Sequence, residues 1–150
     1  MSTELAQALS APVGVAHQLN RLIALERASL DACDAAAGRL DDLSQRAGLR
    51  DMVRNHLQTV DDLMGAVRES GGRPAQTKAD VRHGRAEVRA LTGRVLLAAV
   101  LANYDTIVAG YDRAIEHTAA RSVKAHRVLK RCAKRHRRNR AWLLRHLGGS

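Results

Sequence analysis

Apolar residues recur at alternating spacings of three and four residues along four long stretches of the chain, which is the pattern of helices that bury one face. These stretches cover about residues 15–44, 49–69, 94–117 and 122–147. In the first of them the inward positions are Leu19, Ile23, Glu26, Leu30, Cys33, Ala37 and Leu40. The strict alternation that marks a half-buried strand does not occur. The sequence therefore predicts an all-α protein with four long helices.

The breaks between these stretches predict how the helices are connected. A short turn at residues 45–48 joins the first two helices, and the second helix stops at Ser70-Gly71-Gly72-Arg73-Pro74. The segment that follows has a thin apolar stripe, which predicts a short polar connector helix over about residues 77–91. Two hairpins joined by a connection long enough to cross the bundle form the ferritin-like four-helix bundle. In that topology the first helix runs antiparallel to the second and third long helices.

The ends of the chain are expected to lie outside this bundle. Pro12 and Gly14 interrupt any helix near the start, so residues 1–16 are predicted to form a flexible N-terminal arm. The bundle is predicted to span residues 17–147, and residues 148–150 form a tail.

Three short motifs resemble those of small bacterial ferritin-like four-helix-bundle proteins of unassigned function. They are the run His17-Gln18-Leu19-Asn20-Arg21-Leu22-Ile23, the stop from Glu69 to Pro74, and the segment from Asn103-Tyr104-Asp105 to Tyr111-Asp112. The resemblance covers about residues 17–147 and implies the ferritin-like fold. It implies no particular reaction, because that family is defined by its structure.

Composition narrows the class of protein further. Aromatic residues make up 2% of the chain, and Phe is absent, so small aliphatic side chains must fill the core. The longest apolar run, residues 95–102, is shorter than the ~20 residues of a membrane span, and we expect a cytoplasmic protein with no transmembrane segment. Cys33 and Cys132 are too few and too far apart in sequence for a disulfide framework, and reduced thiols are expected.

Ionisable groups occupy inward positions on all four predicted helices, namely Glu26, His56, a carboxylate at about Asp105, and His136. In di-metal ferritin-like proteins, two helices each supply a Glu and the other two each supply Glu-x-x-His. Here Val53 and Ala133 stand where the Glu of each Glu-x-x-His pair would be. The remaining four side chains predict at most one ion, iron or zinc. Two alternatives stay open: a buried hydrogen-bonded network without metal, or a helical phase that is wrong by one residue.

The positive charge of the chain is concentrated in one helix. Residues 121–147 contain eleven Lys and Arg and no acid, whereas the rest of the chain has 14 Lys and Arg against 15 acids. The predicted polyanion-binding residues are Lys130, Arg131, Lys134, Arg135, Arg137 and Arg138. Their partner would be nucleic acid, bound without sequence preference, or an anionic lipid surface. The alternatives are a solvated basic face, or a homo-oligomer in which Asp41, Asp42, Asp61 and Asp62 of a second copy meet this helix.

No phosphate-binding glycine loop or nucleophile motif occurs, so no catalytic residue is predicted and enzyme activity is not expected. Tyr104 and Tyr111 are predicted to be core anchors. The sequence thus favours a non-catalytic, stress-associated binding protein with a degenerate metal site. A metal-binding oxidase or storage protein and a polyanion-binding module are the alternatives.

Overall fold

The computed structural model describes residues 3–79 and 81–148, with side chains from residue 14 onward. The helices are α1 (Thr3–Arg39), α2 (Leu43–Glu69), the short α3 (Arg85–Arg89), α4 (Gly93–Thr118) and α5 (Val123–Gly148). The described part of the chain contains no strand, so the all-α prediction is confirmed. None of its helices is both long and apolar enough to cross a membrane.

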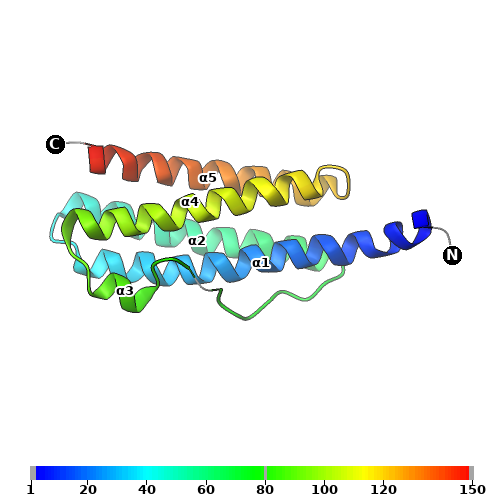
Figure 1. Cartoon of the computed structure of the whole chain (residues 1–150), viewed down its shortest axis with the longest axis horizontal. Coiled ribbons are helices and arrows are strands. Elements are labelled where there is room, and N and C mark those ends of the chain that lie inside the picture. Colours follow the sequence, from blue (N-terminus) through cyan, green and yellow to red (C-terminus); the bar gives the residue numbers. More distant parts are fainter. Residues whose placement is uncertain (1–2, 80, 149–150) are drawn as a thin grey trace.

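The four long helices form two antiparallel hairpins that lie side by side (Figure 1). Helix α1 runs antiparallel to α2 and α4 and parallel to α5 (Figure 1). The segment between α2 and α4 therefore returns along the length of the bundle before α4 begins (Figure 1). We call this segment the crossover. It gives the bundle the predicted topology and distinguishes the fold from a bundle with only short loops.

The crossover is attached to α1 through its backbone. The side chain of Asn20 accepts a hydrogen bond from the Ala75 N–H at 2.7 Å and donates to the Arg73 carbonyl at 3.0 Å. Further along, the Ala79 N–H donates to the Ala24 carbonyl at 3.0 Å. The predicted connector helix is consequently much shorter than residues 77–91, because the first part of the segment bonds to α1 instead of to its own next turn.

Helix α2 begins earlier than the sequence analysis predicted. Asp42 caps it by accepting a hydrogen bond from the Gln45 N–H at 2.9 Å, so the turn after α1 lies at residues 40–42 and not at 45–48. Gly48 therefore lies inside α2, where the indole of Trp142 leaves no room for a Cβ.

The end of α2 is as predicted. Gly71 has a φ of 79°, a left-handed conformation that glycine adopts without strain. The Gly72 N–H then bonds to the Val67 carbonyl at 3.0 Å, which satisfies one of the last carbonyl groups of the helix.

Helix α1 also begins earlier than predicted. Its backbone is helical from Thr3, so Pro12 and Gly14 do not interrupt it. A proline inside a helix removes one backbone hydrogen bond, which is a local cost and does not by itself require the helix to end. The division into an arm at 1–16, a bundle at 17–147 and a tail at 148–150 stays a prediction.

The interior of the bundle is filled mostly by Leu, Ala and Val, with one polar band across its middle. The side chains of this band that lie fully inside are Glu26, His56, Tyr104, Tyr111 and His136, each 0–1% exposed. They come from all four long helices.

Candidate metal centre

Glu26 lies at the centre of the polar band and contacts two histidines. Its Oε2 is 2.5 Å from Nδ1 of His56 on α2, and its Oε1 is hydrogen-bonded to Nε2 of His136 on α5. All three side chains are 0% exposed. One ligand atom from each residue lies within 4.8 Å of the others, so the three groups converge from α1, α2 and α5 on one point.

Helix α4 contributes two tyrosines to the same cluster. The Tyr111 hydroxyl donates to Glu26 Oε1 at 2.6 Å, and the Tyr104 hydroxyl lies 2.9 Å from Nε2 of His56. Asn139 donates to the Tyr104 oxygen at 3.3 Å. The prediction of core anchors is therefore incomplete, because both tyrosines also hydrogen-bond to the ionisable groups.

Burial and charge act in opposite directions on these groups. Burial alone would raise the pKa of Glu26, but the neighbouring His136 and His56 lower it, and the net pKa is below its usual range. Burial would likewise lower the pKa of His56, whereas Glu26 raises it, to about 9. Burial and the charge of Glu26 raise the pKa of Tyr104 and Tyr111 well above 10.0, with Cys33 also contributing at Tyr104. At neutral pH the carboxylate is thus ionised, His56 is protonated and both phenols are neutral.

Asp105, the fourth predicted ligand, does not join the cluster. Its side chain is 53% exposed and pairs with Nε of Arg140 at 2.5 Å. Tyr104 is the α4 residue that faces inward at this level, and the next residue of a helix is rotated by about 100° from it. The inward placement of Asp105 was therefore wrong, whereas the inward placement of Glu26, His56 and His136 is confirmed.

The cluster leaves one polar atom without a partner. Nδ1 of His136 is buried and has no hydrogen-bond partner within the described part of the chain. Cys33 adds a sulfur 3.8 Å from Nε2 of His56. Both cysteines are free and buried, and burial together with the charge of Glu26 raises the pKa of Cys132 to about 12.

The donor set fits one metal ion and does not fit two. Two histidines and one carboxylate are a common ligand set for a single zinc or non-haem iron ion, with positions left open for other ligands. A second ion would need bridging carboxylates. Val53 is half-buried and Ala133 is buried, and neither side chain carries a donor atom.

Three of the predicted polyanion-binding residues on α5 already have acidic partners. Arg131 and Arg135 both pair with Asp62 of α2. Arg137 pairs with Asp112 of α4. Asp62 was predicted above as a possible partner for the basic helix of a second copy. It instead forms ion pairs with α5 of its own chain.

The other three, Lys130, Lys134 and Arg138, are exposed, and no ion-pair partner is found for them among the described residues. The sequence carries no signal for this division. It depends on which helices lie beside α5, and the spacing of residues along one helix does not contain that information.

No family model and no curated protein matches the chain. Solved structures do match it in fold. The bacterioferritin of Desulfovibrio desulfuricans, described as having a diiron site, has a TM-score of 0.82 at 14% identity, over 94% of this chain and 82% of that one. A ferritin-like, diiron-carboxylate protein of Bacillus anthracis has a TM-score of 0.78 at 14% identity, over 98% and 99% of the two chains.

A third structure, a two-domain protein of Anabaena variabilis, combines a DJ-1/ThiJ/PfpI-like domain with a ferritin-like domain. It has a TM-score of 0.72 at 16% identity, and the match covers 89% of this chain and 35% of that one. The fold of this chain is therefore that of a ferritin-like four-helix bundle, as the sequence predicted.

Proposed function

We propose that this ferritin-like bundle binds one divalent transition-metal ion, zinc or iron, through Glu26, His56 and His136. The observation that carries the proposal is the convergence of three fully buried donor groups from three helices within 4.8 Å. The nitrogens that face the Glu26 carboxylate are Nδ1 of His56 and Nε2 of His136, so an ion bound between the three groups would replace the two histidine–carboxylate hydrogen bonds.

The residues around the three ligands support the same role. A metal-bound histidine is usually held by a hydrogen bond from its other ring nitrogen. Nε2 of His56 has the Tyr104 hydroxyl at 2.9 Å, and Asn139 holds that hydroxyl in turn. The proposed role is the binding of a single ion, since one carboxylate is too few to hold the second ion that two-metal chemistry requires.

Metal binding is tested on protein purified without a histidine tag and treated with a chelator. We expect the chain to take up one equivalent of Zn²⁺ or Co²⁺. An ion at 100 times its Kd should then raise the free energy of unfolding by about 2.7 kcal/mol. The measurements are elemental analysis and thermal unfolding with and without metal.

Two variants and one control decide the outcome. His56→Ala and His136→Ala should each lose the equivalent of metal and the thermal shift. His83→Ala is the matched control, because His83 and Glu87 form a histidine–carboxylate pair outside the cluster, 3.4 Å apart. Loss of binding in the control alone, or no stoichiometric uptake by the parent, would contradict the proposal.

A second candidate function rests on the outward face of α5. Six exposed cations have no ion-pair partner in the described chain, namely Lys124, Arg127, Lys130, Lys134, Arg138 and Arg145. Their spacing keeps them on one side of the helix, opposite the buried face, over ~32 Å. We propose that this outward cationic stripe binds duplex nucleic acid without sequence preference, through its phosphates.

Salt dependence tests the stripe. With six phosphate contacts, binding should fall by about 10³ between 50 and 200 mM salt. The Lys130→Gln, Lys134→Gln, Arg138→Gln triple variant should lower the salt slope by about 3, as measured by fluorescence anisotropy with a labelled duplex.

The matched control removes three cations that already have acidic partners: Arg131→Gln, Arg137→Gln, Arg140→Gln. It has the same net charge as the first triple variant and should retain most of the binding. Equal losses in both variants would show a response to net charge alone. If the parent protein fails to bind the duplex at 50 mM salt, the outward cationic stripe is only a solvated basic face.

A further inference from the structure

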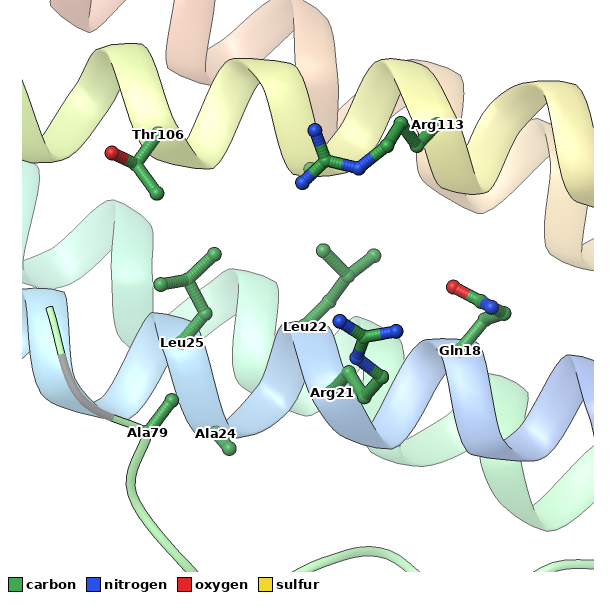
Figure 2. Close-up of a pocket in the computed structure, with 9 residues that line it drawn as sticks. Gln18, Arg21, Leu22, Ala24, Leu25, Ala79, Thr106 and Arg113 are labelled. Atoms are coloured by element: carbon green, nitrogen blue, oxygen red, sulfur yellow. The ribbon is translucent and has the colours of Figure 1, made fainter.

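A cavity of about 310 Å³ lies between α1 and α4, on the side of the bundle that the crossover borders. Leu22 and Leu25 of α1 form its apolar floor, and Gly110 of α4 and Ala79 of the crossover also line it (Figure 2). We call it the α1–α4 cavity. It is separate from the cluster of Glu26, His56 and His136, because none of these three residues lines it.

Two arginines border this apolar floor. Figure 2 shows Arg21 extending from α1 and Arg113 from α4, with their guanidinium groups directed toward Leu22. Both are exposed, and neither has an ion-pair or hydrogen-bond partner among the described residues. None of the described residues that line the cavity is acidic. The cavity therefore combines an apolar surface with two cations that no residue in the described ranges neutralises.

Gly110 keeps part of the cavity open in the middle of α4. A Cβ at this position would lie 3.5 Å from Leu22 Cδ2 and 3.7 Å from Leu25 Cδ2, which is ordinary van der Waals contact. Close packing thus does not require glycine here, although glycine is the poorest helix former after proline. A larger side chain at position 110 would extend into the cavity.

We propose that the α1–α4 cavity binds a small organic anion, with its carboxylate or phosphate head between Arg21 and Arg113 and a short apolar chain over Leu22 and Leu25. Arginine pairs with either head group through two parallel N–H donors. The volume is at the lower end of the range for small-molecule sites, which limits the ligand to a short chain.

The test uses octanoate and octyl phosphate as probes, and acetate and octanol as comparisons that lack either the chain or the charge. Calorimetric titration of the full chain should give binding of at least one charged probe, with acetate and octanol about ten-fold weaker or more. The stronger of the two charged probes identifies the head group. A parent that binds neither probe would overturn the proposal.

The variants test the two parts of the site separately. Arg21→Gln and Arg113→Gln should each weaken binding about two- to five-fold, because the ion pairs are exposed. Arg50→Gln, on the exposed side of α2, is the control for lost net charge and should bind as the parent does. Gly110→Leu should abolish binding, whereas Gly65→Leu, where nothing lies within 4 Å of the added Cβ, should not.

The double variant Arg21→Gln, Arg113→Gln should also bind the probes more weakly than the parent. Unchanged binding in this variant, or in Gly110→Leu with normal helical content, would overturn the proposal. Association between copies of the chain that the arginine substitutions abolish would also overturn it, because a second chain would then be the occupant. Sedimentation at several protein concentrations measures that association.

Discussion

Replacing Glu26 by alanine should lower the free energy of unfolding of the metal-free chain by about 3–5 kcal/mol. Glu26 is 0% exposed, and it bonds to both histidines of the cluster and to the Tyr111 hydroxyl. Its removal takes away the counter-charge that keeps His56 protonated, so His56 loses its ion pair and hydrogen bond with Glu26, and the Tyr111 hydroxyl is left without an acceptor. Urea unfolding followed by circular dichroism measures the loss.

Two other substitutions separate charge from volume and position. Glu26→Gln keeps the size and one acceptor oxygen, so it should cost less than Glu26→Ala. Asp105→Ala removes an exposed carboxylate whose ion pair with Arg140 contributes at most about 1 kcal/mol. It should also leave metal binding unchanged, since Asp105 is not in the cluster. A loss for Glu26→Ala no larger than that for Asp105→Ala would show that the buried pairs contribute nothing.

The stability of the metal-free chain should fall as the pH rises from 6.5 to about 9. The folded-state pKa of His56 is raised from 6.5 to about 9, so its stabilising effect is complete below pH 6.5 and is lost as the pH passes through 9. The loss should approach ~3 kcal/mol, from the size of the pKa shift. The pKa of Glu26 is lowered from 4.5, so its contribution is lost as the pH falls below 4.5.

Maximum stability is therefore expected between pH 4.5 and 6.5. Urea unfolding in the presence of a chelator, repeated across this range, gives the curve. His56→Gln should be less stable than the parent at pH 6 and nearly flat between pH 6.5 and 9. A parent whose stability rises over that interval would contradict the assignment of a proton to His56.

The sequence predicted the bundle and most of the cluster for one physical reason. The alternating spacing of three and four residues identifies the inward face of each helix, so polar residues on that face are visible as exceptions. Glu26, His56 and His136 are three such exceptions, and all three are fully buried. The stop at Gly71 was also predictable, because a glycine with positive φ ends many helices.

Other features depend on information that spacing does not contain. On α4, Tyr104 occupies the inward position, so Asp105 points elsewhere, and the prediction of Asp105 as a ligand did not follow the apolar spacing. The helix cap at Asp42 is a local sequence signal, but the predicted start of this helix followed the apolar spacing, which places it later in the chain. The pairing of α5 arginines with acids of α2 and α4, and the cavity beside Gly110, arise only when separate helices come together.

A short stretch of α1 contacts three separate features of the molecule. Over residues 20–27 it meets the polar cluster through Glu26, the crossover through Asn20, and the α1–α4 cavity through Leu22 and Leu25. Arg21 is the one exposed residue in this stretch. About two turns of α1 therefore have almost no neutral positions, and sequence divergence among related chains should be slowest there. The outward cationic stripe of α5 pairs with no acid within the described chain, and phosphate binding there requires only positive charge, so Lys and Arg should replace each other freely at its positions.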